Sequence, residues 1–209
     1  MTDRLRSVAR LMVPLVAALV MACGDDPVGT TPPLLPKFEN LSQRSNVLNN
    51  FELAFNKRNI DRYDQLVDAN LVFTYEVYIA GVWTTQQWDR ATDIAGNTAL
   101  FGDAVKLDFD LNWEDGVAWA AIPATDASGE TWYTTTVFYY FVIKIGDTTY
   151  IANTGSKIEM TIRNAGTSSS PRWQLVKAHD LGEPTVVAVA NSTASTEPTT
   201  LWQIESLYH

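Results

Sequence analysis

The sequence predicts an α+β domain in which N-terminal helices pack on a strongly curved antiparallel sheet. Apolar side chains recur at helical spacing through residues 45–55, which indicates a helix with one buried face. Residues 105–113 alternate between apolar and polar side chains, as a strand with one buried face does. Residues 131–145 are apolar on both faces near their centre, so they are expected to form a strand covered on both sides.

Two helices are expected first. The longer one begins near Ser45, and its buried face holds residues at positions i, i+4, i+7 and i+8: Val47, Phe51, Ala54 and Phe55. Asn59 is a suitable N-cap for a short second helix. The alternating residues 71–77 then predict a strand, which Ala80 and Gly81 turn back.

A third helix is expected to begin at Thr84 or Thr85, because Thr84 and Gln87 have the spacing of a capping box. Its apolar face is expected to hold Trp88, Ala91, Ala95 and Ala99. Gly102 is expected to end this helix.

The remaining elements are expected to be mostly strands. An extended segment covers residues 148–164 and bends near Gly155, and residues 172–180 form the last strand of the sheet. Residues 182–209 form a tail rich in Thr, Ser, Ala and Pro, which is expected to end in a short helix from about Thr200.

Residues 1–22 have the pattern of an export signal. Three arginines precede an apolar run from Leu11 to Ala22. This run is too short to cross a hydrocarbon core, which needs about 20 residues. The stretch VMAC at residues 20–23 resembles the bacterial lipobox, which implies cleavage between Ala22 and Cys23 and lipidation of Cys23.

Cys23 is the only cysteine in the chain, which excludes an intramolecular disulfide. Acylation with fatty acids such as palmitate would consume its thiol and anchor the protein to a membrane. By resemblance to enterobacterial sorting rules, Gly24 in place of an aspartate favours the outer membrane over the inner one. Residues 23–38 contain four prolines and are expected to form an extended tether that holds a periplasm-facing domain.

The composition excludes several classes of function. The chain has 209 residues and a net charge of −9, and this acidic balance without a basic run argues against nucleic-acid binding. The two histidines, His179 and His209, cannot build a histidine-rich metal site, and no glycine-rich phosphate loop occurs. No cofactor or metal is therefore expected.

Residues 47–75 resemble the first two helices and the following strand of one protein superfamily. Residues 172–182 resemble the closing strand of the same superfamily. This superfamily contains nuclear transport factor 2, ketosteroid isomerases and SnoaL-like polyketide cyclases. The resemblance covers a domain at residues 39–181, and within the superfamily the chain is most similar to uncharacterised lipid-anchored bacterial members. It implies a cone-shaped, cystatin-like barrel with a pocket between the sheet and the helices. In the enzymes of the superfamily, an Asp or His in this pocket acts as a base, and a Tyr or protonated acid stabilises an enolate.

His179 and Asp180 are the candidate bases, because they end the closing strand. Adjacent strand residues point to opposite faces, so at most one of them faces the pocket. In a regular strand, Leu175 and Ala178 would point to opposite faces, and a bulge between them would place both on the same face. The sequence therefore does not decide which face of the sheet His179 or Asp180 occupies. The alternatives are a surface position for His179 and a strand-end Asp180 bonded to backbone amides.

Four aromatic residues are candidates for lining the pocket: Tyr75, Trp88, Tyr139 and Tyr140. Tyrosines on buried strands also serve as packing residues with the hydroxyl at the edge of the core. Asp108 and Asp110 alternate with apolar residues and are expected on the solvent face, which removes them as catalytic candidates.

Three hypotheses for function follow. The leading one is a non-catalytic cell-envelope lipoprotein that binds a small apolar ligand or a protein partner, because no convincing acid–base pair is visible. The second is a SnoaL-like isomerase, cyclase or hydrolase with His179 or Asp180 as base, and it would gain support from one of these residues lying inside within reach of a tyrosine. The third is a scaffold that forms a homodimer through its sheet, and a pocket filled by Phe and Trp would favour it.

Overall fold

The structure is a computed structural model, and it describes residues 37–79, 82–113, 116–126, 129–181, 187–189 and 194–195. The chain divides after Pro36 into two units, and the described residues belong to the second one, Lys37–His209. The expected signal peptide, the Cys23 lipidation site, nearly all of the tether and the helix near Thr200 lie outside the described residues.

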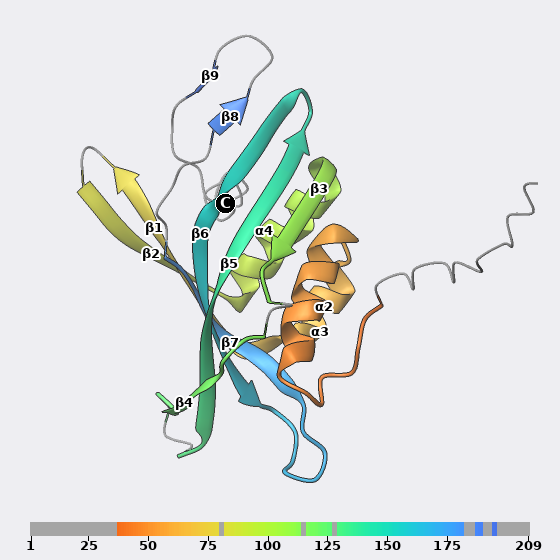
Figure 1. The fold of residues 1–209 in the computed structure, drawn as a ribbon, viewed down its shortest axis with the longest axis vertical. Helices are drawn as coiled ribbons and strands as arrows, with labels where there is room; N and C mark the ends of the chain where they lie inside the picture. Colours follow the sequence, from red (N-terminus) through yellow and green to blue (C-terminus); the bar gives the residue numbers. More distant parts are fainter. Residues whose placement is uncertain are drawn as a thin grey trace, which may run out of the picture. The chain divides into compact units, whose positions relative to one another are not determined.

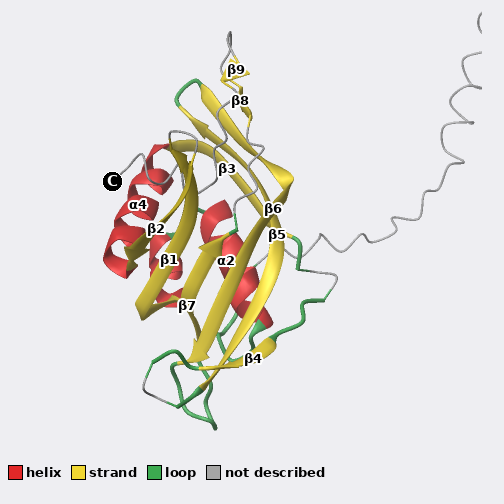
Figure 2. Ribbon diagram, turned by 90° about the vertical axis from the view of Figure 1, so that its left-hand side faces the viewer, coloured by secondary structure: helices red, strands yellow, loops and turns green. Residues whose placement is uncertain are grey.

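Three described helices cover one face of a curved sheet (Figures 1 and 2). They are α2 (Ser45–Asn56), α3 (Ile60–Leu66) and α4 (Arg90–Asp103). The face of the sheet that they cover is called the inner face below. This arrangement confirms the α+β architecture expected from the sequence. Among the described residues, no helix is both long and apolar enough to span a membrane.

The described strands form one sheet, whose main path runs β2-β1-β7-β6-β5-β3. The strands are β1 (Val67–Ile79), β2 (Val82–Asp89), β3 (Ala104–Leu111), β4 (Ala120–Pro123), β5 (Thr131–Ile145), β6 (Thr148–Asn164), β7 (Trp173–Asp180), β8 (Val187–Val189) and β9 (Ala194–Ser195). Neighbouring strands are antiparallel except β1 and β7, which run parallel. The main path ends at β2 and β3 without these two strands pairing, so the described sheet curves but does not close into a complete barrel.

The first two helices follow the sequence expectation. The buried residues of α2 include the four predicted for its apolar face. Asn59 caps α3, because its side-chain oxygen accepts a hydrogen bond from the Arg62 backbone N–H over 3.0 Å. Aromatic rings then join α2 to the sheet, with the Phe55 and Phe109 ring centroids 5.0 Å apart. Burying a side chain of this size stabilises the fold by roughly 1.5–3 kcal/mol.

The expected start of the third helix was wrong. Residues from Thr84 to Asp89 belong to strand β2, where Thr85 pairs with Glu76 of β1. Helix α4 begins at Arg90, because the Asp89 side chain accepts a hydrogen bond from the Thr92 backbone N–H over 2.9 Å. The capping-box spacing of Thr84 and Gln87 was misleading, since pairing with a neighbouring strand outweighs a local signal.

The predicted buried face of this helix was also wrong. Ala91 and Ala95 are exposed, and Ala99 is only half-buried. The buried residues are instead Asp93, Gly96, Asn97, Leu100 and Phe101. Helix α4 therefore turns a partly polar face towards the core.

The later strands agree with the sequence pattern. β5 and β6 pair along most of their length, and their register shifts between Tyr139 and Phe141, close to the bend expected near Gly155. In the tail, residues 187–189 form strand β8, which pairs with β6. β9 at residues 194–195 pairs with β8 in turn.

Candidate functional site

A bulge in β7 decides which candidate residues face the inside of the domain. Leu175 pairs with Ile162 and Lys177 with Thr161, so Val176 is an extra residue on β7. Because of this extra residue, Leu175 and Ala178 are both buried in the core. Asp180 follows Ala178 by two positions and lies on the same inner face, where it is fully buried.

Asp180 and Tyr139 form a hydrogen-bonded pair inside the domain. The Tyr139 hydroxyl donates to Oδ1 of Asp180 over 3.1 Å. The pKa of Tyr139 is raised well above its ordinary value, mainly by burial and further by the negative charge of Asp180. A hydrogen bond with Ser156 acts in the opposite direction. Tyr139 therefore keeps its proton at neutral pH and can serve as a donor.

Aromatic and aliphatic side chains surround this pair. Tyr75 of β1 and Ile158 of β6 occupy the positions opposite Asp180 on its two neighbouring strands. Tyr75 packs against Trp88, with ring centroids 4.6 Å apart, and both side chains are 8% exposed. The ring of Tyr139 also lies parallel to that of Phe141. The carboxyl group of Asp180 is thus a polar group set into an apolar sheet face.

His179 lies on the opposite face of the sheet from Asp180. Its Nε2 atom is 3.5 Å from Oε1 of Glu76, which also accepts a hydrogen bond from Thr85. About a third of the His179 side chain is exposed, at 35%. His179 is therefore separated from the Asp180–Tyr139 pair by the thickness of the sheet.

The structure brings three of the four predicted pocket residues together, namely Tyr75, Trp88 and Tyr139. Tyr140 is half-buried and follows Tyr139 on the strand, so it points to the opposite face. Asp108 and Asp110 are exposed on β3, as the alternation predicted.

A second buried polar group lies under α4. Asp93 and Asn97 are one helical turn apart, and both are fully buried. The hydroxyl of Tyr63 donates to Oδ1 of Asp93 over 3.3 Å, and the Asn97 amide donates to the Asp93 backbone oxygen over 3.1 Å. We call Tyr63, Asp93 and Asn97 the α4 polar cluster.

Burial raises the pKa of Asp93 to about 7. Hydrogen bonds from Tyr63 and Trp88 and the positive charge of Arg90 oppose this shift. Trp88 therefore lies close to both buried carboxyl groups, since it packs on Tyr75, the strand partner of Asp180, and lowers the pKa of Asp93. A carboxyl group whose pKa is near neutrality can give or take a proton at physiological pH.

Sequence reasoning did not find the α4 polar cluster, because the expected helix register placed alanines on the buried face. The available signal was Asp89 followed by Thr92, a cap five residues after Thr84. A helix that starts there has Asp93 on its buried face. Within the residues that the structure describes, no group of three or more His, Cys, Asp or Glu side chains is arranged to hold a metal ion.

Comparison with known proteins gives likenesses of structure and none of sequence. No family model matches the chain, and no curated protein matches it. Among solved structures, a conserved protein from Planctomyces limnophilus is 12% identical, with a TM-score of 0.46 over 69% of this chain and 94% of that one. An NTF2-like protein of unknown function in nutrient uptake from Rhodospirillum rubrum is 16% identical, with a TM-score of 0.42 over 66% of this chain and 95% of that one.

A further solved structure is a type 2 hexachlorocyclohexane dehydrochlorinase. It is 9% identical, with a TM-score of 0.45 over 69% of this chain and 84% of that one. These likenesses concern the arrangement of helices and strands. What the domain does is therefore argued from its own residues.

Proposed function

We propose that this protein is a lipid-anchored cell-envelope protein whose domain binds a small, mainly apolar ligand on the inner face. Asp180 and Tyr139 would hold the one polar group of this ligand. The anchor rests on the sequence of residues 1–23, and the outer membrane is the proposed location. The observation behind the binding function is the hydrogen-bonded pair of Asp180 and Tyr139 on a sheet face that is mainly apolar around it, with Ser156 as a polar neighbour.

The energetic argument compares Asp180 with an aliphatic side chain in the same place. Burying a carboxyl group costs several kcal/mol more than burying an aliphatic group, and hydrogen bonds recover only part of this cost. Its partners on the two neighbouring strands are Tyr75 and Ile158, and neither side chain carries a charge. Buried carboxyl groups are concentrated at functional sites, which supports a role for Asp180 in contacting a ligand.

The ligand class follows from the same surroundings. Tyr75 and Trp88 offer aromatic surface on one side of the pair, which suits a flat or aliphatic ring. Asp180 can accept a hydrogen bond from a ligand, and the Tyr139 hydroxyl, which has one proton, can donate it to a ligand in exchange for its bond to Asp180. A hydroxyl or carbonyl group on an apolar skeleton would satisfy both residues.

Proton transfer is a second candidate function, because Asp180 is buried within hydrogen-bond reach of Tyr139, which is the arrangement named above as support for an enzyme. Asp180 would take a proton from a carbon beside a carbonyl group. Tyr139, whose pKa is raised by burial, would then donate its hydrogen bond to the oxygen that becomes negative. The second buried carboxyl, Asp93, is not needed for this step.

The test is to purify the full-length protein in detergent, extract bound small molecules with organic solvent and identify them by mass spectrometry. An apolar compound with a hydroxyl or carbonyl group should accompany the wild type. Asp180→Asn should reduce its amount several-fold, and Asp108→Asn, which changes an exposed aspartate, should not. Finding no compound with the wild type, or the same amount with Asp180→Asn, would overturn the proposal.

A further inference from the structure

The first two turns of α4 bury polar side chains where most helices bury apolar ones. Asp93 and Asn97 are fully buried there, and Ile94 is only partly buried. The large apolar side chains that α4 buries, Leu100 and Phe101, lie in its last turn. Residues 90–97, which we call the α4 latch, are therefore held to the domain mainly by polar contacts.

These polar contacts are incomplete. The Tyr63 hydroxyl and the Asn97 amide both approach Oδ1 of Asp93, at 3.3 and 3.5 Å. Within the described part of the chain, no well-aligned donor reaches Oδ2 of Asp93 or Oδ1 of Asn97, although both atoms are buried. A buried acceptor without a donor destabilises the state that contains it. A proton on Asp93 supplies an O–H donor at this place, one helical turn from Asn97.

The groups around Asp93 leave its protonated form favoured up to neutral pH. Burial raises the pKa of Asp93 to about 7, against the opposing effects of Tyr63 on α3, Trp88 on β2 and Arg90 on α4. Arg90 is the positive charge that acts on Asp93, and it is also engaged in an ion pair with Asp64 of α3. Its charge is therefore shared between two carboxyl groups.

The sheet below the α4 latch adds aromatic surface and a carboxyl group. Helix α4 packs on β1 and β2, as Figure 2 shows. The inner-face side chains of these strands include Phe73, Tyr75 and Trp88, which are uncharged at neutral pH. Asp180, the strand partner of Tyr75, is a further buried carboxyl on this face. The α4 latch therefore lies next to the aromatic side of the inner-face site.

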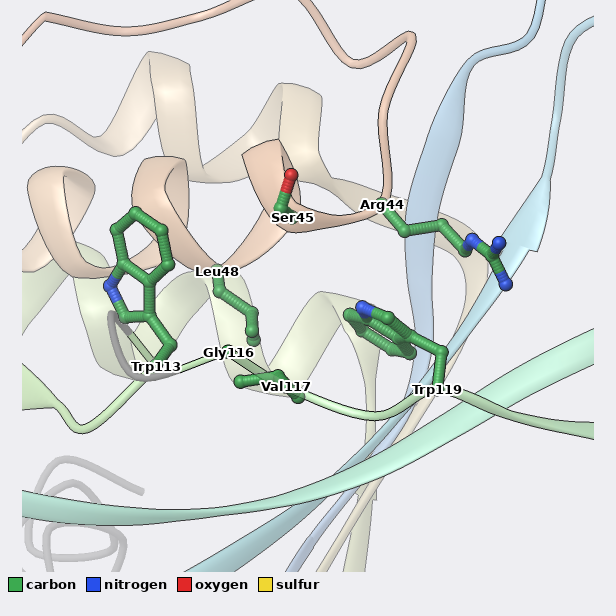
Figure 3. Close-up of a pocket in the computed structure, with 7 residues that line it drawn as sticks. All are labelled: Arg44, Ser45, Leu48, Trp113, Gly116, Val117 and Trp119. Carbon is green, nitrogen blue, oxygen red and sulfur yellow. The ribbon is translucent and has the colours of Figure 1, made fainter.

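Helix α2 is held differently and serves as an internal reference. Its buried residues are mostly apolar and include Leu48 and Phe51, and none of its buried side chains is ionisable. Figure 3 shows Leu48 pointing from α2 towards Val117 of the segment that follows β3. The attachment of α2 to the domain therefore does not depend directly on the protonation of its own buried face.

Local opening of the α4 latch would expose Asp93 to water. Its pKa would then fall from about 7 towards the ordinary value of 3.8, so opening releases a proton between about pH 4 and pH 7. The equilibrium constant for opening should therefore rise with pH in this range, by up to about ten-fold per pH unit. Above about pH 7 it should level off, because Asp93 is then ionised in both states.

We propose that the α4 latch is a pH-sensitive element, which stays closed on the inner face while Asp93 holds a proton and opens more readily as this proton is lost. Opening uncovers the strands that carry Tyr75 and Trp88 and so gives access to Asp180. This control of access rests on the binding function proposed above, whereas the opening itself does not.

Hydrogen–deuterium exchange of the full-length protein in detergent tests the opening, followed by mass spectrometry from pH 5 to pH 8. Protection factors are used, because they divide out the intrinsic effect of pH on exchange. Protection of the α4 latch should be at least ten-fold lower than that of α2, and it should fall with pH in the wild type. Asp93→Asn should keep the protection of the α4 latch constant across the series. Asp103→Asn, an exposed change on the same helix, should follow the wild type.

Tyr63→Phe gives an independent readout if Asp93→Asn does not fold. The Tyr63 hydroxyl lowers the pKa of Asp93, so its removal should move the levelling of protection to a higher pH than in the wild type. Protection that does not change with pH in the wild type, or that falls equally in Asp93→Asn, would overturn the proposal. Equal protection of the α4 latch and α2 at every pH would also overturn it, because α4 would then open only when the whole domain unfolds.

Control of access is tested with 2-naphthalenemethanol, a neutral aromatic alcohol of the proposed ligand class, using protein-free micelles as the blank. Its association rate should be several-fold higher at pH 7 than at pH 5 in the wild type and equal at both in Asp93→Asn. Equal rates in the wild type would overturn the control of access. No binding at either pH would contradict the ligand site at Asp180 together with this control, and hydrogen exchange would still decide whether the α4 latch opens.

Discussion

Tyr139 donates a hydrogen bond to Asp180 across the strand that separates them. The two residues are 41 positions apart in the chain, and β6 lies between their strands β5 and β7. The long tyrosine side chain spans this gap over the inner face of β6. The hydrogen bond therefore links two strands that are not neighbours in the sheet, at the place where a ligand is proposed to bind.

The hydrogen bond predicts a measurable loss of stability for Tyr139→Phe. Removing the hydroxyl takes a donor away from a fully buried carboxyl group, which should lower the free energy of unfolding by about 1–3 kcal/mol. Urea denaturation at neutral pH measures this difference. Tyr140→Phe is the control, because Tyr140 is half-buried on the other face, and it should change the stability by less than about 0.5 kcal/mol. Equal effects of the two changes would contradict this role for Tyr139.

Asp93 predicts a pH dependence of stability. Its pKa is about 7 in the folded protein and near 3.8 in an ordinary exposed aspartate, so the folded state holds a proton that the unfolded state has lost between these values. The stability that Asp93 contributes is therefore complete below about pH 4 and is lost as the pH rises through about 7.

The comparison of wild type with Asp93→Asn isolates this effect. Asparagine imitates the protonated acid, so the variant should gain stability relative to wild type as the pH rises from about 4 to about 7, by at most roughly 1.4 kcal/mol per pH unit. Chemical denaturation at a series of pH values measures the difference. Asp103→Asn, an exposed change at the end of the same helix, should show no such trend. A constant difference between Asp93→Asn and wild type would show that Asp93 is ionised throughout.

Asp89 predicts a capping effect at the start of α4. Asp89→Ala removes the acceptor for the Thr92 N–H and should lower the melting temperature, whereas Asp89→Asn keeps an acceptor and should remain close to the wild type. The hydrogen bond from Thr92 also lowers the pKa of Asp89. If Asp89→Ala and Asp89→Asn melted together, the side chain would not be acting as the cap.

The lipid anchor predicts a change in mass and location for Cys23→Ser. The wild type should carry acyl groups on Cys23 and sediment with membranes. The variant should lack these groups, and it should either keep residues 1–22 or be released as a soluble domain. Intact-protein mass spectrometry and membrane fractionation measure both properties. Unchanged mass and unchanged membrane retention would rule out Cys23 as the attachment point.

Local sequence patterns correctly predicted the helices and strands in which buried residues recur at a regular spacing. The spacing of Val47, Phe51 and Phe55 identified α2, and Asn59 marked the start of α3. The alternation through Asp108 and Asp110 identified β3 and its exposed face. In these elements the local preference and the tertiary environment agree, so the sequence is sufficient.

The site itself depends on features that a local pattern does not contain. The bulge at Val176 changes the phase of β7, and only its pairing with β6 shows that Asp180 rather than His179 faces inward. Asp93 was missed for a related reason. A polar residue is buried there because Tyr63, 30 positions away, supplies a hydrogen bond. Both features arise from contacts between distant parts of the chain.

The central claim is that Asp180 and Tyr139 serve ligand binding rather than folding. The double variant Tyr139→Phe with Asp180→Leu tests it most directly, with stability and bound ligand measured on the same preparation. Replacing a buried polar pair with apolar groups of similar shape is often neutral or stabilises a protein by about 1–4 kcal/mol. We expect a stability equal to or above that of the wild type and no extractable ligand. A double variant that is less stable than the wild type and keeps its ligand would contradict the account.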